Sequence, residues 1–289
     1  MVQRRECRCE RSAPGRLPVA LGPGQLPAGT GISGGRPVAR AGSVAIYESS
    51  ATSRYDSLQL QLRGRFHRST QYQVSYTLSK AVDDVSDVFD LAGAPALPQN
   101  SLTFAGERGP ANFDVRHRFT YSFIASLPKL KGRQRLMRAL FANFQIAGSG
   151  SLRMGQPYTV NSIFDVNLDG NLTDRLDNTN GLVATGDRRR PLRLTTTDPT
   201  TLLAPIGQDG RVRRNTFRAG NVIELDLSLS RNLYLSGSRR LLLRADIFNL
   251  INRANFGIPV RLLGAQNFGQ AIDTITPSRR IQLQVKYAF

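Results

Sequence analysis

The chain has 289 residues, enough for one large domain or two ordinary ones, and a hydrophobic content of 40% that suits a folded protein. No segment approaches the ~18 consecutive apolar residues of a membrane-spanning helix, so any membrane crossing would have to be made by strands. The formal net charge of +18 raises nucleic acid as a partner, but the arginines are spread along the chain without a basic helix or zinc-ligand spacing, so we expect no nucleic-acid partner.

The N-terminal segment differs from the rest of the chain. Residues 1–43 are rich in glycine, proline and arginine and lack strand or helix periodicity, so we expect a disordered or non-native segment. Cys7 and Cys9 are too close in sequence to bridge each other easily, and no second pair completes a metal site. No apolar run typical of a signal peptide is present there. A short strand is expected near 44–49, and the folded part is assigned to 44–289.

Seven further segments alternate apolar and polar side chains, the pattern of a strand with one face in an apolar medium and one in water. They are residues 58–66, 72–79, 118–127, 144–152, 223–230, 240–247 and 280–289. In the last segment every second side chain is apolar up to Phe289. Such a strand would invite aggregation as an unpaired edge in water, whereas a closed membrane barrel has no edge.

The connections between these strands sort by length. In an up-and-down sheet, the short connections and the C-terminus lie at one end, and the long connections 83–114, 156–218 and 252–277 lie at the other. Outer-membrane barrels have short periplasmic turns and long outer loops in this way. The sequence therefore predicts an all-β, antiparallel, up-and-down transmembrane β-barrel. Seven or eight strands could just close a small barrel, but these loops are longer than such a barrel needs, so we expect part of a larger one.

Several motifs, in a fixed order along residues 44–289, resemble the C-terminal barrel of TonB-dependent receptors, in the subgroup whose N-terminus carries a carboxypeptidase-regulatory-like domain. The motifs are YTLSKAVDD at 76–84, ERGP at 107–110, FDVRHRF at 113–119, SLRMGQPY at 151–158, RNTFR at 214–218, LDLSLSR at 225–231 and RADIFNLINRANFG at 244–257. Each motif is weak alone, and their order gives the resemblance its strength.

The resemblance implies a barrel of about 22 strands in the outer membrane of a Gram-negative-type bacterium, closed by an N-terminal plug and energised by the TonB complex. It implies four kinds of partner: outer-membrane lipid, the plug with the N-terminal barrel strands, the TonB complex through the N-terminal region, and a nutrient ligand. This chain lacks the plug, the energy-coupling box and most of the strands. We therefore expect a receptor fragment, and a truncated or misassigned open reading frame would explain both residues 1–43 and the missing signal peptide.

Two other functions compete with the receptor fragment. A small self-closed barrel could act as a porin or an adhesin, and a soluble basic β-protein could bind nucleic acid. Catalysis is not expected, because His67 and His117 have no partner spacing typical of a metal or a triad, and no nucleophile elbow occurs. We expect neither a catalytic residue nor an organic cofactor.

One loop has the side-chain spacing of a calcium site. Oxygen-bearing side chains occupy relative positions 1, 3, 5 and 10, and Gly170 occupies position 6. These side chains are Asp165, Asn167, Asp169 and Asp174. Hard cations need several oxygens that converge around a sharp turn. Because position 12 is Leu176 rather than a bidentate glutamate, we expect weak calcium binding at most. A solvated loop that uses these residues for turns is the alternative.

Overall fold

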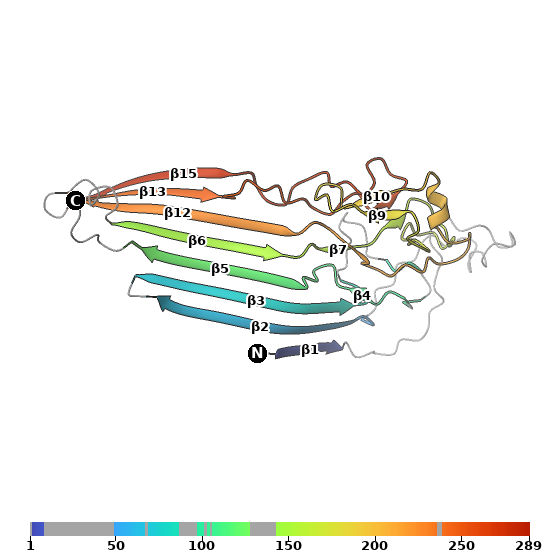
Figure 1. Ribbon diagram of the computed structural model, residues 1–289. Coiled ribbons are helices and arrows are strands. Elements are labelled where there is room, and N and C mark those ends of the chain that lie inside the picture. The colour runs from blue at the N-terminus through green and yellow to red at the C-terminus, as the bar shows by residue number, and fades with distance from the viewer. Residues whose placement is uncertain are drawn as a thin grey trace.

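The computed structural model describes residues 2–8, 49–66, 69–86, 97–100, 103–104, 106–127, 143–235 and 239–289. Their main element is a nine-stranded antiparallel sheet (Figure 1). Its strands are β1 (Val2–Arg8), β2 (Thr52–Phe66), β3 (Thr70–Asp83), β4 (Gly109–Pro110), β5 (His117–Ser126), β6 (Phe144–Arg153), β12 (Val222–Tyr234), β13 (Arg240–Phe248) and β15 (Arg280–Ala288). All seven strands predicted from alternation are present, and the all-β antiparallel class is confirmed.

The sheet is open. Its strand order is β1-β2-β3-β5-β6-β12-β13-β15, with β4 beside β3, so β1 and β15 are edges at opposite sides (Figure 1). Within the described residues no strand pairs with the free edge of β15, which fits part of a barrel rather than a closed one. The described residues contain no helix with the length and apolar character needed to span a membrane.

Strand β1 departs from the expectation for the N-terminal segment. Residues 2–8 pair antiparallel with β2, from Val2 opposite Leu58 to Arg8 opposite Thr52. Residues 2–8 thus form a strand within the segment 1–43, which we expected to be disordered or non-native. The physical reason is that β2 offers a row of otherwise unpaired N–H and C=O groups, which an extended segment can satisfy. The rest of that segment, and the strand expected near 44–49 apart from its last residue, lie outside the described residues.

The register gives the sheet one apolar and one polar face. Apolar residues lie opposite one another from strand to strand, in the row Leu60, Tyr76, Phe119, Leu152 and Ile223. On the other face, polar residues follow the same path in the row Gln61, Ser75, Thr120, Ser151 and Glu224. The apolar face is uncovered, with Leu60 55% and Leu283 77% exposed. So large a continuous apolar surface requires an apolar surrounding.

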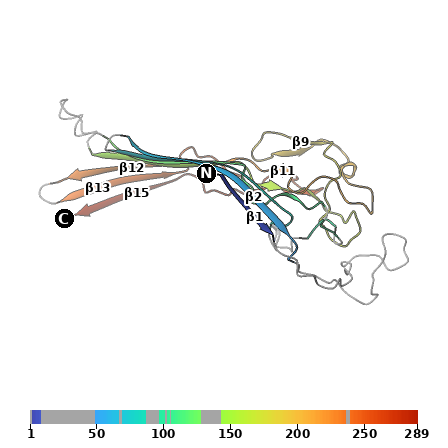
Figure 2. The same ribbon diagram turned by 90° about the horizontal axis from the view of Figure 1, so that it is seen from below.

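The polar face encloses space. A cavity of about 760 Å³ lies against it, lined by residues of six strands. Polar side chains from β2, β3, β5, β6, β12 and β13 contribute, among them Arg63, Gln73, Ser122, Ser149, Asp226 and Arg244. The strands β12, β13 and β15 turn away from the line of β2 and β3 in the view from below (Figure 2). The sheet therefore carries its polar face on the hollow side, as the wall of a water-filled barrel does.

The long connections form a compact assembly of their own at one end of the sheet, while the C-terminus lies at the other end (Figure 1). Their short elements are β7 (Pro157–Tyr158), β8 (Asn161–Ser162), β9 (Leu182–Ala184), β10 (Leu192–Leu194), η1 (Pro199–Leu202), β11 (Phe217–Arg218) and β14 (Leu262–Leu263). Strands β7 and β11 pair with each other, as do β9 with β10 and β8 with β14. The first two pairs fold the connection 156–218 back on itself, and the pair of β8 with β14 joins it to the connection 252–277.

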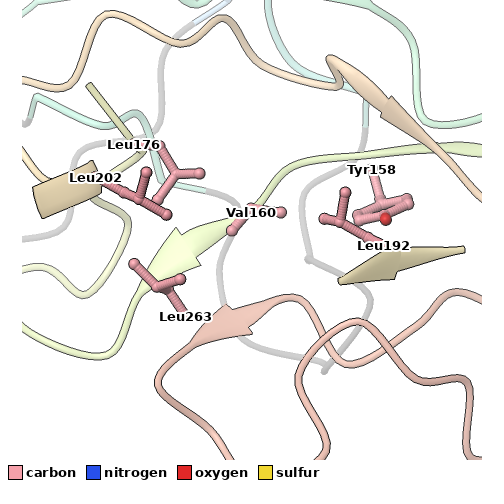
Figure 3. Packing of buried hydrophobic residues seen from close by; sticks show 6 residues of the cluster. All are labelled: Tyr158, Val160, Leu176, Leu192, Leu202 and Leu263. Atoms are coloured by element: carbon pink, nitrogen blue, oxygen red, sulfur yellow. The ribbon is translucent and has the colours of Figure 1, made fainter. Parts of the chain in front are cut away.

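A hydrophobic core holds this loop assembly together. Its buried members, here called the loop core, are Tyr158, Val160, Leu176, Leu192, Leu202 and Leu263. Figure 3 shows their side chains arranged around Val160. Leu176 and Leu202 are completely buried, in contrast to the leucines of the sheet. The connections 156–218 and 252–277 therefore share one hydrophobic core.

Candidate functional site

Three ion pairs fasten the loop assembly where it meets the end of the sheet. We call them the rim ion pairs: Asp83 with Arg214, Glu107 with Arg175, and Asp114 with Arg218. In each pair the acid lies between the end of β3 and the start of β5, and the arginine lies between β6 and β12. All three acids are almost fully buried. Buried charges are tolerated only when they are paired and hydrogen-bonded, so these pairs fix two connections relative to each other.

The pair of Glu107 and Arg175 belongs to a fully bonded network. Arg175 Nη1 lies 3.1 Å from Glu107 Oε2, and both side chains are only 5–6% exposed. Arg175 Nε donates to Gln99 Oε1 at 2.6 Å, while the Gln99 backbone N–H donates to Glu107 Oε1 at 3.0 Å. Gln99 Nε2 donates to the Gly210 carbonyl at 3.1 Å. Three segments of chain are thus held by one glutamine and one ion pair.

Arg214 makes a similar connection at the end of β3. Its Nη2 donates to the Asp83 carboxylate and to the Asp83 carbonyl, and its Nε donates to the Glu107 carbonyl at 2.9 Å. The neighbouring Asn215, with φ at +57°, donates from Nδ2 to the Pro110 carbonyl at 2.6 Å. A Cβ at Gly109 would lie 2.6 Å from the Arg214 carbonyl oxygen. Glycine is therefore needed for the two backbones to approach so closely.

A groove of about 620 Å³ lies among the three long connections. Its polar lining includes Asn112, Gln156, Thr159, Asn161 and Arg214, and its apolar lining includes Ile258, Val260, Ile272 and Ile275. Mixed linings with a few placed polar groups are typical of small-molecule sites. Tyr158 also lines the groove, and burial raises the pKa of its hydroxyl, so it stays protonated and can act as a hydrogen-bond donor. The groove can therefore accept an amphipathic ligand.

The loop with calcium-type spacing, residues 165–174, is here called the acidic loop. The Asp165 carboxylate accepts the backbone N–H groups of Asp169 at 3.1 Å and Gly170 at 2.8 Å. Asn167 Oδ1 accepts the N–H of Asp169 at 3.1 Å, and Asp169 Oδ1 accepts that of Asn171 at 2.9 Å. The backbone turns through positive φ at Leu168 and at Gly170. The first three predicted residues are thus brought together around one tight turn.

Asp174 is the last residue of the acidic loop, and its side chain bonds to the backbone near the start of the loop. Its Oδ2 accepts the N–H of Val166 at 2.9 Å, whereas its Oδ1 is buried without a hydrogen-bond partner. The pKa of Asp174 is raised to about 7, mainly by burial; the nearby carboxylates of Asp165 and Asp169 add to the rise, and the backbone N–H groups of Val166 and Asn167 oppose it. Among the described residues, no three His, Cys, Asp or Glu side chains are gathered as a ready metal cluster. Calcium binding here therefore remains a prediction.

The sequence showed arginines spread along the chain, but it did not predict the rim ion pairs. Asp114, Arg214 and Arg218 all lie inside the motifs of the resemblance, which was the available signal. His117 accepts or donates a hydrogen bond at Nδ1 with the Tyr76 hydroxyl, 2.8 Å away, in keeping with the structural role expected. His67 lies outside the described residues. The sequence predicted no catalytic residue.

A family model described as "Outer membrane beta barrel domain" matches residues 13–282. The match thus covers most of the chain, and it begins at residue 13 rather than at 44, where the folded part was expected to start. No curated protein matches the chain. No solved structure matches it either.

Proposed function

Since the chain belongs to the outer membrane beta barrel domain family, we propose that it is the C-terminal part of a TonB-dependent receptor, which forms barrel wall and outer loops for energised nutrient uptake. Its role is binding and passage rather than catalysis, without an organic cofactor. Outer-membrane lipid would surround the apolar face, and the plug and the remaining strands would come from sequence that precedes the barrel portion described here. The TonB complex would act only through that N-terminal region.

The open sheet is the observation that carries this proposal. A strand in lipid must pair its backbone, because lipid offers no hydrogen bonds, and the free edge of β15 has no partner in the described sheet. More strands would supply that partner in a larger barrel. The small self-closed porin or adhesin would instead need β15 to pair with the far edge at β1 or β2. A soluble nucleic-acid-binding protein is disfavoured by the uncovered apolar face.

The loop assembly is suited to the capture of a ligand at the outer end. The proposed mechanism begins with binding in the groove among the connections 83–114, 156–218 and 252–277, and continues with movement of the plug, which other sequence would supply. The groove offers both amide groups and apolar side chains. A bulky nutrient with both polar and apolar parts fits that lining.

The genomic DNA upstream of the chain tests the proposal directly. We expect coding sequence for a plug and about 14 further strands in one of the frames, as a barrel of about 22 strands requires. Upstream DNA without such sequence would contradict the receptor fragment and favour the small barrel. It would also remove the hypothesis of a truncated or misassigned reading frame.

A second test uses the chain alone, fused to a signal peptide. Unpaired backbone groups in lipid cost several kcal/mol each, so we expect inclusion bodies or envelope stress rather than a pore. The measurements are heat-modifiable gel mobility and conductance in planar bilayers. A heat-modifiable monomer with steady single-channel conductance would identify a self-closed barrel instead.

A further inference from the structure

We propose that the acidic loop binds one calcium ion through the carboxylates of Asp165, Asp169 and Asp174 and the amide oxygen of Asn167. The site is independent of the proposed transport function, because it concerns only the loop assembly. The bound calcium ion would stabilise the connection 156–218. Nothing in the family match assigns a metal to this chain.

The buried carboxylate of Asp174 is the first step of the argument. The residue is 1% exposed, and its Oδ1 has no hydrogen-bond partner. A buried, unpaired carboxylate oxygen is costly unless a cation or a donor reaches it. Its other oxygen, Oδ2, accepts the backbone N–H of Val166, so the Asp174 side chain meets the same tight turn that the side chains of Asp165 and Asn167 bond to.

Arg175, which directly follows the acidic loop, and Arg211, which bonds to Asp177 just after it, have partners of their own. Arg175 is directed to Glu107 and Gln99. Arg211 donates from Nε and Nη2 to the two oxygens of Asp177, both at 2.6 Å. The acidic loop therefore concentrates negative charge that these two arginines do not neutralise. A small hard cation can meet that charge with oxygen ligands alone.

The loop backbone already presents the side chains from one turn. Its N–H groups bond to the side-chain oxygens of Asp165, Asn167 and Asp169 around this turn. Each of these oxygens keeps a lone pair for a metal. Because the carboxylates do not yet form a closed cluster, calcium binding requires them to move closer together, at the expense of some of these hydrogen bonds. Calcium tolerates such irregular geometry with 6–8 oxygens, whereas magnesium demands a near-ideal octahedron.

The affinity should be modest. Counted from Asp165, position 12 of the calcium-type spacing is Leu176, just after the acidic loop. Leu176 is completely buried in the loop core and cannot serve as a ligand. Without a bidentate glutamate, a dissociation constant of about 1 mM is expected, within the range of extracellular calcium modules. Since Leu176 and Arg175 follow Asp174 directly, the cation would restrain both the loop core and a rim ion pair.

Limited trypsin digestion of the full chain in detergent micelles tests this site. Arg175 is buried, so cleavage after it reports opening of the acidic loop, whereas Arg188 and Arg189 are exposed and serve as internal controls. The test uses protein preparations in which cleavage after Arg175 is at least tenfold slower than cleavage after these two exposed arginines. At 10 mM calcium we expect cleavage after Arg175 to slow by about 10-fold, as mass action at that affinity gives. Cleavage at the exposed arginines should not change.

Two variants separate ligation from folding. Asp174→Asn and Asp165→Asn should keep Arg175 protected relative to the exposed arginines but lose the response to calcium. Asp198→Asn is the matched control, because Asp198 is exposed, caps η1 and lies outside the acidic loop. Rates with and without calcium are compared within each variant, so any effect of the substitution on trypsin itself cancels. Calorimetric titration should give one site, with weaker binding of magnesium.

Three results would overturn the calcium site. The first is unchanged cleavage after Arg175 at 10 mM calcium in the unsubstituted chain. The second is a calcium response in both Asp174→Asn and Asp165→Asn that equals the response of the unsubstituted chain, which would place the ion elsewhere. The third is micromolar affinity that survives Asp169→Ala, which would mean that the ligands are wrong.

Discussion

The strands and the loop assembly of this chain place their apolar residues in opposite ways. In the sheet, large side chains such as Leu283 point outward and are exposed, and the polar residues line the hollow side. In the loop assembly, Leu176 and Leu202 are fully buried and the charges at its base are paired. The two regions of the chain therefore suit different surroundings. The sheet needs lipid outside, and the loops fold by the ordinary hydrophobic effect in water.

The two regions also use glycine differently. On the apolar face of the sheet, Cβ atoms at Gly148 and Gly150 would lie 2.5 Å and 2.4 Å from the rings of Phe123 and Tyr121 on the neighbouring strand. The aromatic rings thus cover the backbone of β6. In the loops, a Cβ at Gly155 would lie 1.9 Å from the Ala219 carbonyl oxygen, so glycine there permits backbone contact. The space beside glycine is thus occupied by aromatic rings in the sheet and by backbone atoms in the loops.

The largest expected effect comes from breaking a rim ion pair. Glu107→Gln should destabilise the loop assembly by about 3–5 kcal/mol, because it leaves the Arg175 charge buried without its counter-charge. Urea titration measures the loss in every variant when it is followed by near-UV circular dichroism, to which the buried Tyr158 of the loop core contributes. The double change Glu107→Met with Arg175→Met should cost less than Glu107→Gln alone. A double variant that is less stable than Glu107→Gln alone would contradict this expectation. It would show that the ion pair stabilises the loop assembly by more than the cost of burying its two charges.

The faces of the sheet give the next largest effect. Leu227→Arg and Leu243→Arg should each cost about 2–4 kcal/mol near the bilayer midplane, whereas Ser228→Arg on the polar face should cost much less. Urea unfolding of the complete receptor barrel in phospholipid vesicles, with these residues changed in its C-terminal part and far-UV circular dichroism as the readout, compares the three. Equal tolerance at all three positions would contradict the assigned faces. None of the three should alter cleavage after Arg175, since the loop assembly folds on its own core.

The sheet was predictable from sequence because its signals are local. Alternation with period 2 located all seven strands, and loop lengths gave the end at which the long connections gather. The rim ion pairs were not predictable in this way, because Asp83 and Arg214 are 131 positions apart, and no short pattern joins them. For the acidic loop, spacing identified the residues, but the buried Oδ1 of Asp174 depends on packing against Val166 and the rest of the loop.

A single asparagine at the junction of the two regions should have an intermediate effect. Asn255 is 1% exposed; its Oδ1 accepts the N–H of Ile223 at 3.0 Å and its Nδ2 donates to the Ile223 carbonyl at 2.9 Å. Asn255→Ala leaves both backbone groups of β12 without partners, which should cost about 1–3 kcal/mol. Hydrogen exchange at Ile223 measures the loss locally. Asn180→Ala at an exposed loop position is the control and should change stability by less than about 0.5 kcal/mol.

The smallest effect should come from the exposed ion pair of Arg211 with Asp177. Its two hydrogen bonds are short and parallel, yet the Arg211 side chain is 79% exposed, so water and salt screen the charges. The hydrogen bond from Arg211 lowers the pKa of Asp177. Any stabilisation from this pair is therefore present at neutral pH and is lost as the pH falls through that lowered pKa.

Arg211→Ala should accordingly leave the urea midpoint of the loop assembly unchanged at pH 7 within experimental error. The same titration in 1 M salt, where the Debye length is about 3 Å, should remove any residual difference from the unsubstituted chain. The comparison with Glu107→Gln isolates burial, since both variants break one arginine–carboxylate pair in the same loop assembly. A loss for Arg211→Ala as large as that for Glu107→Gln would mean that geometry, rather than exclusion of water, gives the rim ion pairs their strength.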